Sequence, residues 1–262
     1  MLALSSPVLG GKVESGGIVL EVGGAEPMTV KCRTVIISAG LNAPAVARTI
    51  NGIPAATIPP TFYAIGSNYR NHVIERSKVK GFKEPKFYDR PRVGYRANSA
   101  LIPSGANIVK PKDSGPRFEY EGELVAVVGK TMRNVSPEEA TRGIFGWTIG
   151  NDVSERTWQR GDRTGWRAKN SDTFNPMGPW IVSGANYRDM TTAVRLNGEE
   201  VDRFQTGAMI HDVETYIAEI SKYCTLYPGD VIWMGTDGAP RNMKPGDVCE
   251  IEISGIGVLC NP

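Results

Sequence analysis

The stretch at residues 121–128, EGELVAVV, constrains the fold of this chain more than any other part of its sequence. In an extended strand, alternate side chains share a face. Val125 and Val127 therefore lie on one face of the predicted strand, and Leu124 and Ala126 lie on the other. Because both faces are apolar, we expect this strand to be covered on both sides, in the interior of a sheet.

The rest of the chain is rich in turns. Thirty glycines and 18 prolines among 262 residues favour many turns and short strands over long helices. Short strands joined by Pro-Gly and Gly-Asp turns are expected within 226–235, 244–253 and 253–259. The pattern is typical of a β-rich α+β fold.

Two helices are predicted by their capping residues. Ser136 begins a capping box, with Pro137 at the first helical position, and the helix is expected to run to about residue 145. Asp212 is expected to cap a second helix. The apolar face of that helix contains Val213, Tyr216, Ile217 and Ile220.

Residues 1–60 differ from the remainder, and we expect them to form a small N-terminal region before a main domain at 61–262. Within that region, 18–22 and 34–38 resemble strands and 42–50 resembles a helix. In the main domain, the stretch at 76–96 is charged and broken by glycine and proline. It is expected to be a surface loop that covers a site.

Composition excludes several classes of protein. Thirty basic and 28 acidic residues give a net charge of +2, which argues against binding to nucleic acid or to a membrane surface. No apolar run approaches the ~20 residues of a membrane-spanning helix, and the N-terminus lacks the features of a secretory signal. The four cysteines show no metal-finger spacing and are expected to be reduced, in the cytoplasm.

Two carboxylates lie on one face of the strand at 121–128. Glu121 and Glu123 share that face, and their charges repel in an enclosed space unless protons or a cation neutralise them. A hard divalent cation with oxygen ligands would do so. Solvated charges at an exposed strand start are an equally good interpretation from spacing alone, and Glu119 shares the same face.

Other polar side chains are candidates for the same site. Asp152 is expected at the end of a strand within 146–156, where ligands are common, although a turn aspartate explains it too. His72 and Glu75 are three residues apart, so on a helix they can hydrogen-bond and form a general base that activates water. From spacing alone, a pair on the surface of a helix is the better interpretation. Lys169 lies in a segment that suggests a fixed loop, although a lone lysine is usually solvated at the surface.

Taken together, these segments resemble the fumarylacetoacetate hydrolase family over about residues 62–262. The resemblance depends on the joint occurrence, in order, of E-x-E-L at 121–124, N-D-x-S-x-R at 151–156, A-K-x-x-D-T-F at 168–174, P-G-D-V-I-x-x-G-T at 228–236 and the terminal G-I-G at 255–257. The family implies a twisted, roll-like arrangement of mixed sheets with few helices, and a homodimer.

The resemblance also implies roles for individual residues. Glu121, Glu123 and Asp152 match the positions of the Mg²⁺ or Mn²⁺ ligands, which selects the E-x-E pair over Glu119. His72 and Glu75 match a His–Glu dyad on a segment that closes over the substrate. Residues that match the remaining family positions are Lys169 as the active-site lysine, and Arg156, Gln205 and Thr236 as substrate contacts.

The leading functional expectation is a metal-dependent hydrolase that cleaves a carbon–carbon bond in an acylpyruvate or β-diketo acid. In that reaction His72, oriented by Glu75, activates water, and Lys169 or water protonates the departing fragment. The same metal and lysine would also support an oxaloacetate-type decarboxylase or an isomerase or hydratase of 2-oxo-dienoic acids from aromatic catabolism. A catalytically silent metal- or ligand-binding protein is the alternative outside the enzymes.

Three features depart from the family pattern. Many members have Lys-Pro where this chain has Arg96-Ala97, so contacts to the substrate oxygens are expected to differ there. Asp237 adds a carboxylate after Gly235-Thr236. Residues 18–64 resemble a fragment of an FAD-dependent oxidoreductase, but no G-x-G-x-x-G motif occurs in the chain, so no FAD binding is expected.

Overall fold

The computed structural model describes residues 8–15, 17–22, 28–32, 50–51 and 61–262. The chain divides into two compact units, Met1–Ile58 and Pro59–Pro262. In the first unit, the four strands form a sheet in the order β3-β2-β1-β4. These strands are β1 (Val8–Glu14), β2 (Gly17–Val22), β3 (Met28–Cys32) and β4 (Ile50–Asn51).

Of the three elements expected in the N-terminal region, one lies among the described residues. The strand expected at 18–22 is confirmed as β2. The strand expected at 34–38 lies outside the described residues, and so does the helix expected at 42–50, apart from residue 50, which belongs to β4.

The second unit contains a seven-stranded sheet in the order β6-β5-β15-β9-β10-β12-β7. Its strands are β5 (Phe62–Ile65), β6 (Val93–Tyr95), β7 (Leu101–Ile102), β9 (Gly122–Val128), β10 (Ile144–Asn151), β12 (Asn175–Val182) and β15 (Val231–Trp233). The sheet is mixed, because β15–β5 and β12–β7 pair in parallel and the other neighbours are antiparallel.

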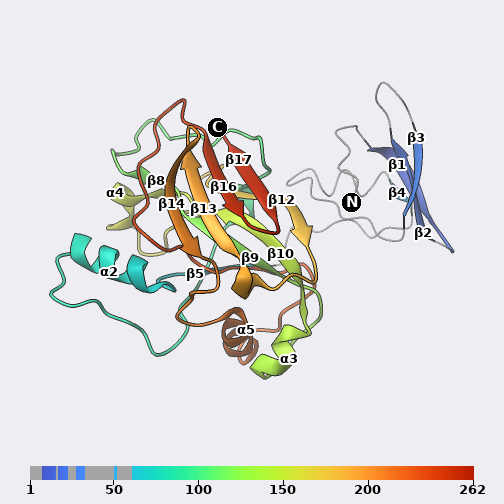
Figure 1. Ribbon diagram of the computed structural model, residues 1–262, viewed down its shortest axis with the longest axis horizontal. Coiled ribbons are helices and arrows are strands. Elements are labelled where there is room, and N and C mark those ends of the chain that lie inside the picture. Colours follow the sequence, from blue (N-terminus) through green and yellow to red (C-terminus); the bar gives the residue numbers. More distant parts are fainter. Residues whose placement is uncertain (1–7, 16, 23–27, 33–49, 52–60) are drawn as a thin grey trace. The chain divides into compact units, whose positions relative to one another are not determined.

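An antiparallel four-stranded sheet has the order β14-β13-β16-β17. Its strands are β13 (Thr191–Leu196), β14 (Glu199–Gln205), β16 (Cys249–Ile253) and β17 (Gly257–Asn261). It lies across β9 and β10 in Figure 1. A third, two-stranded sheet pairs β8 (Phe118–Glu119) with β11 (Ser154–Glu155).

Strand β9 is buried on both faces, as the sequence predicted. Leu124 and Ala126 belong to the larger apolar cluster, which also contains side chains from β13, β16 and β17 and therefore fills the space between the two large sheets. Val125 and Val127 belong to a second cluster with Phe62, on the opposite face. A strand enclosed in this way has a fixed register, since a shift of one residue would exchange its two faces.

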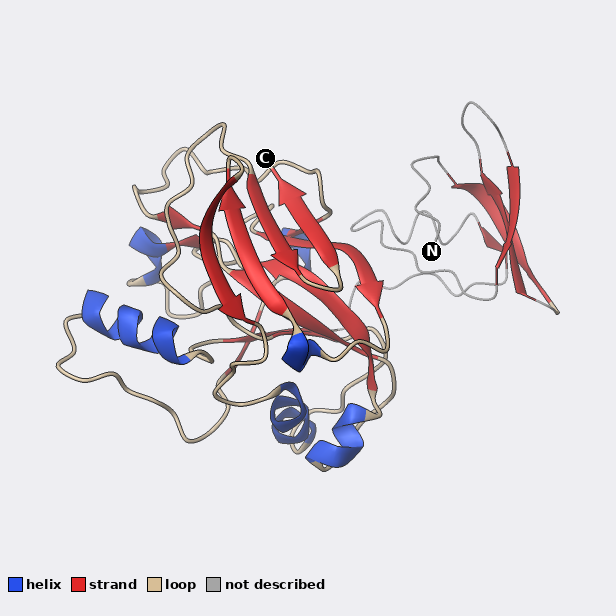
Figure 2. Cartoon of the chain, in the orientation of Figure 1, coloured by secondary structure: helices blue, strands red, loops and turns tan. Residues whose placement is uncertain are grey.

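Among the described residues, the helices are few and short (Figure 2). They are α2 (Arg70–Val79), α3 (Pro137–Thr141), α4 (Arg156–Gln159) and α5 (Val213–Ser221), with 3₁₀ turns at Asn98–Ala100 and Tyr187–Asp189. The β-rich mixed fold expected from the sequence is thus confirmed. No described helix is long and apolar enough to cross a lipid bilayer.

The predicted helix caps are confirmed, with one difference in detail. Ser136 forms the expected capping box with Glu139, but α3 ends at Thr141 instead of about residue 145, because Ile144 already pairs with β9. Asp212 caps α5 as expected. The side chain of Glu155 caps α4.

The segment at 76–96, expected to be one surface loop, contains regular structure at both ends. Helix α2 continues to Val79, and β6 occupies Val93–Tyr95 and pairs with β5. Between them the chain is irregular, and the carbonyl of Tyr88 accepts a hydrogen bond from the ring of His211 (3.0 Å). Its closure over a site stays a prediction.

Candidate active site

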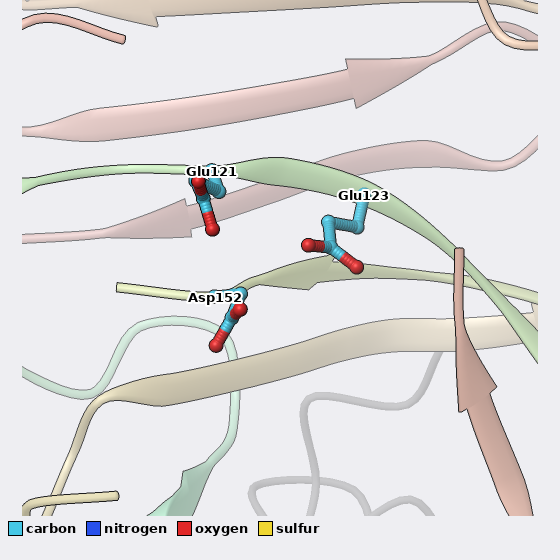
Figure 3. A group of neighbouring side chains, drawn as sticks. All are labelled: Glu121, Glu123 and Asp152. Carbon is cyan, nitrogen blue, oxygen red and sulfur yellow. The ribbon is translucent and has the colours of Figure 1, made fainter. Parts of the chain in front are cut away.

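Three carboxylates meet where two central strands lie side by side (Figure 3). Glu121 precedes β9, Glu123 lies within it, and Asp152 follows the last residue of β10. Glu123 pairs with Gly150 in the antiparallel ladder, and the Asp152 amide donates to the carbonyl of Glu121 (2.9 Å). One ligand oxygen from each carboxylate lies within 4.8 Å of the others, and each residue is at most 6% exposed.

Two glycines allow the backbone to approach this site closely. Gly150 packs against the indole of Trp233, where an added Cβ would lie 2.5 Å from the ring. Gly235 has a φ of +86°, a conformation that favours glycine. Its N–H donates to Glu123 Oε2 (2.8 Å) and so fixes the orientation of that carboxyl group.

Cationic side chains already contact two of the three carboxylates. Arg96 forms a fork on Asp152, with Nε donating to Oδ1 (2.8 Å) and Nη2 to Oδ2 (2.7 Å). Lys169 Nζ donates to Asp152 Oδ2 (2.7 Å) and to Glu121. Arg156 also donates to Glu121. Side-chain cations, which the sequence-based argument did not consider, therefore offset part of the repulsion between the carboxylates.

These contacts determine the charge states of Glu121 and Asp152. Burial by itself raises the pKa of Glu121, but Arg156 and Lys169 outweigh it and hold the pKa well below its usual value. Burial likewise raises the pKa of Asp152, and Arg96 and Lys169 together lower it. Both side chains are thus anionic at neutral pH.

Glu123 is in a different electrostatic environment. Burial, followed by the charges of Asp152 and Glu121, raises its pKa well above the usual value, and none of the described residues forms an ion pair with it. Glu121, Glu123 and Asp152 thus offer a metal ion oxygen atoms only, and one of the three carboxyl groups, that of Glu123, has no compensating charge. Such a set fits a hard divalent cation, Mg²⁺ or Mn²⁺, rather than a softer metal.

His72 faces the same carboxylates from helix α2. Its Nε2 lies 3.7 Å from Glu121 Oε1, and its Nδ1 lies 3.0 Å from the carbonyl oxygen of Gly238. A carbonyl can only accept, so this contact places the proton on Nδ1 and leaves the Nε2 lone pair toward the carboxylates. Burial lowers the pKa of His72 more than the charge of Glu121 raises it. The neutral imidazole is therefore competent as a base.

The expected hydrogen bond between His72 and Glu75 is not formed, although both residues lie on α2. Glu75 instead accepts from Lys78 Nζ (2.7 Å), and its side chain is 40% exposed. The reason is that Gly238 already occupies Nδ1 of His72, while Nε2 faces Glu121. A backbone carbonyl thus orients the imidazole where a carboxylate was expected.

The other predicted substrate contacts differ in their placement. Thr236 is buried and lines the cavity beside the carboxylates. Gln205, the last residue of β14, is exposed and does not line it. Arg156 uses its guanidinium on protein groups, since Nε donates to Glu119 (2.6 Å) and Nη1 to Gln159 (3.2 Å). Glu119 does not belong to the group of carboxylates whose oxygens lie within 4.8 Å of one another.

Sequence reasoning missed several groups around His72. Asp237, interpreted as a change in the charge of the site, accepts from the backbone N–H of His72 (3.0 Å) and from Asn71 Nδ2 (3.1 Å). It therefore holds the first turn of α2 against the strand end at Gly235. The carbonyl of Gly238 has no signature in a sequence, because every residue has one.

The carboxylates open into a cavity with a volume of about 860 Å³. His72, Lys169 and Arg96 line its inner part with the three carboxylates, and Arg76, Lys80 and Arg92 lie among its outer lining. The cavity is of the size that binds small molecules.

Comparison with known proteins gives relatives that span nearly the whole chain. This chain is 30% identical over 284 residues to "Oxaloacetate tautomerase FAHD2A, mitochondrial" of Bos taurus, and the alignment covers 98% of this chain and 88% of that protein. It is 36% identical over 218 residues to "2,4-didehydro-3-deoxy-L-rhamnonate hydrolase" of Sphingomonas sp., covering 79% and 73%. The crystal structure of "5-carboxymethyl-2-hydroxymuconate delta-isomerase" from Mycobacterium smegmatis superposes with a TM-score of 0.72 at 30% identity, covering 96% and 91%.

These relatives bear on the N-terminal residues as well. The expected resemblance of residues 18–64 to a fragment of an FAD-dependent oxidoreductase has no support, because the bovine and mycobacterial relatives extend across that region too. The short stretch that suggested it, around S-A-G-L at 38–41, is too brief to identify a family by itself.

The family model for "Fumarylacetoacetate (FAA) hydrolase C-terminal" matches residues 61–262. This match covers most of the chain and includes every residue of the site described above, and the relatives agree with it in sequence and in fold. The chain therefore belongs to the fumarylacetoacetate hydrolase family.

Proposed function

We propose that this enzyme interconverts the keto and enol forms of a small 2-oxo acid by moving a proton at the carbon next to the oxo group. The observation that carries the proposal is the juxtaposition of three groups at one buried place. The carboxylates of Glu121, Glu123 and Asp152 lie within 4.8 Å of one another. The amine of Lys169 contacts two of them, and the imidazole of His72 faces Glu121.

Glu121, Glu123 and Asp152 would hold Mg²⁺ or Mn²⁺. The ion, when bound, supplies Lewis acidity that makes the carbon next to the 2-oxo group more acidic. The chain's own groups perform the proton transfers. His72 Nε2 accepts a proton from that carbon while Gly238 retains the proton on Nδ1. Lys169 Nζ, which is held by Asp152 and Glu121, is a positioned donor on the other side of the carboxylates.

Thr236 supports binding of the substrate's oxygens, because its hydroxyl is at the cavity wall. Arg156 is a positioning residue in this proposal, because its guanidinium is bonded to Glu119 and Glu121. Gln205 has no role in it. The guanidinium of Arg96 binds both carboxylate oxygens of Asp152 and so keeps this proposed metal ligand negatively charged.

Carbon–carbon bond hydrolysis is the second candidate. One relative with 36% identity is named as a hydrolase, and the same His72 would remove a proton from water. Isomerisation is preferred because two relatives that cover 96% or more of the chain are named as a tautomerase and an isomerase. Isomerisation also needs no His–Glu dyad. This agrees with the structure, because Glu75 pairs with Lys78.

The test uses proton exchange, which follows enolisation of any 2-oxo acid. Loss of the C3 proton signal of oxaloacetate, 2-oxoadipate or acetylpyruvate in D₂O is measured by NMR, with Mg²⁺ or Mn²⁺ and with EDTA. We expect metal-dependent exchange above the spontaneous rate, abolished in D152N and retained in E199Q, a surface carboxylate control whose side chain is 74% exposed.

Three outcomes separate the candidates. Cleavage products from acetylpyruvate without prior C3 exchange would establish the hydrolase and overturn isomerisation. Loss of carbon dioxide from oxaloacetate as the main event would establish the decarboxylase. Metal uptake in calorimetry with no exchange of any substrate would leave a silent binding protein.

The homodimer and the cytoplasmic location stay predictions. Light scattering during size-exclusion chromatography tests the first. Cys224, Cys249 and Cys260 form no disulfide with one another in the described part of the chain, and their reduced state stays a prediction.

A further inference from the structure

The carboxyl group of Asp202 has an unfavourable place in the fold. Asp202 lies in β14, and its Oδ2 is buried and accepts no hydrogen bond from the described residues. A buried carboxylate oxygen without a donor destabilises a protein, because it has lost its water and gained no partner. Residues that break the rules of stability in this way are expected at functional sites. The surroundings of Asp202 therefore point to a role in the site.

Asp202 packs directly on Gly238. A Cβ added at Gly238 would lie 2.5 Å from Oδ2 and 2.9 Å from Oδ1 of Asp202. An added Cβ takes the direction of one Cα–H bond of the glycine, so that bond points at the carboxyl group. The carboxyl oxygens thus accept from the Cα–H, which is a weaker interaction than an N–H hydrogen bond. They also fill the space into which the Gly238 peptide could otherwise turn.

Residues 237 and 238 in turn hold His72 at two places. The carboxylate of Asp237 accepts from the backbone N–H of His72 (3.0 Å), and the carbonyl oxygen of Gly238 lies 3.0 Å from Nδ1 of its ring. The first contact fixes the start of α2, and the second fixes the tautomer of the imidazole. Asp202 therefore contacts the residue that orients the proposed base.

The groups that face Asp202 compensate its charge poorly. Burial and then the charge of Asp237 raise the pKa of Asp202 to about 6, although the backbone of Arg203 and the guanidinium of Arg241 lower it. Tyr120 is a further neighbour, and burial followed by the charge of Asp202 raises the pKa of its phenol. A carboxyl group whose pKa is raised by folding lowers stability once the pH exceeds its unfolded value. At neutral pH the ionised Asp202 thus costs stability.

We propose that Asp202 is a positioning residue for His72, because its carboxyl group holds the Gly238 peptide whose carbonyl keeps the proton on Nδ1. This inference rests on the proposed function, in which Nε2 of His72 is the base. Without the carboxyl group, the Gly238 carbonyl can turn into the space beside β14, and the imidazole then takes both tautomers. In the wrong tautomer Nε2 carries the proton and cannot accept another. Turnover should fall, while the carboxylates that would hold the metal are unaffected.

The experiment compares the wild type with D202A and D202N. Asparagine keeps the shape of the side chain and one oxygen, whereas alanine removes the contact with Gly238. E200A is the matched control, because Glu200 lies on the same strand but pairs with Arg203 at the surface. For each protein, kcat and KM for C3 proton exchange of oxaloacetate, 2-oxoadipate and acetylpyruvate and the Kd of Mg²⁺ by calorimetry are measured. D202S is a second truncation, for use if D202A does not fold.

The tautomer of His72 is measured directly, from the ring ¹⁵N shifts of histidine in the metal-free protein and with Mg²⁺. The chain has only two histidines, His72 and His211. The spectrum of H72A therefore assigns both rings, and His211 serves as the internal reference.

We expect D202A to lower kcat about 10-fold, as a small displacement of a catalytic group does, with KM and the Kd of Mg²⁺ within about 2-fold of the wild type. Its His72 shifts should move to a mixture of tautomers. D202N should restore most of kcat and should be more stable than the wild type in urea at pH 8, because it carries no buried charge. E200A should change none of these values.

Three results would overturn the inference while leaving the proposed function intact. They are a wild-type kcat in D202A, a D202A protein in which His72 keeps its proton on Nδ1, and a D202N protein that loses stability and kcat together. If the wild type exchanges none of the three acids, the proposed function fails, and the tautomer of His72 in D202A alone decides whether Asp202 positions the ring.

Discussion

Arg96 competes with a bound metal ion for Asp152, and its removal should therefore tighten metal binding. The guanidinium occupies both carboxylate oxygens, at 2.8 and 2.7 Å. A divalent ion that uses Asp152 must displace at least one of these charge-assisted hydrogen bonds, each of which contributes about 1.5–3 kcal/mol. Removing that competitor predicts a Kd about 10- to 100-fold lower for Mn²⁺ in R96A than in the wild type, at 1.4 kcal/mol per tenfold.

The assay is isothermal titration of the metal-stripped protein with Mn²⁺ and Mg²⁺ at constant pH. R203A is the matched control, because Arg203 makes the same two-bond fork on a carboxylate, that of Glu200 (2.7 and 2.6 Å), at the surface. We expect R203A to bind metal like the wild type. An R96A protein that is folded by circular dichroism and binds Mn²⁺ with equal or lower affinity would refute the reasoning.

Three further predictions concern other parts of the site. Because a backbone carbonyl orients the imidazole of His72, E75Q should change the rate of C3 proton exchange by less than about 2-fold, whereas H72A should lower it by about 100-fold or more. Equal losses of exchange in the two variants, measured by NMR, would show that Glu75 acts with His72 after all. In the metal-free protein, the raised pKa of Glu123 means that the unfolding free energy falls as pH rises from about 4.5 through the folded-state pKa. E123Q should therefore gain stability over the wild type from acid to alkaline pH in urea titrations, and a constant difference would contradict this. G150A should lower the unfolding free energy by about 1–3 kcal/mol, since its Cβ would meet the ring of Trp233 at 2.5 Å; an unchanged urea midpoint would exclude that clash.

The sequence predicted the structure best where the pattern of neighbouring residues agreed with the packing of the whole fold. The two apolar faces of residues 121–128 predicted a covered strand, and β9 is buried on both sides. The caps at Ser136 and Asp212 were predicted correctly because capping depends on residues three positions apart. The end of α3 was not predicted correctly, because the pairing of Ile144 with strand β9 ends the helix early.

The site shows the same division between local and long-range information. Spacing could put Glu121 and Glu123 on one face, but whether that face was open to solvent depended on residues distant in sequence that pack over it. His72 and Glu75 had the right spacing for a dyad, and yet a carbonyl 166 residues away in sequence took the place of the carboxylate. A resemblance identifies the residues of a site, whereas their actual partners require coordinates.

The amide of Gln159, which accepts from both Arg76 and Arg156, joins two halves of the cavity that are built on different supports. The carboxylates sit on strands that two apolar clusters enclose, while Arg76 and Lys80 sit at the outer end of a helix with few buried residues. Replacements on that helix therefore cost little folding energy, whereas replacements on β9 disturb the core. Residues of that helix other than His72 can therefore vary, and change the lining of the cavity, without disturbing the strands that carry the carboxylates.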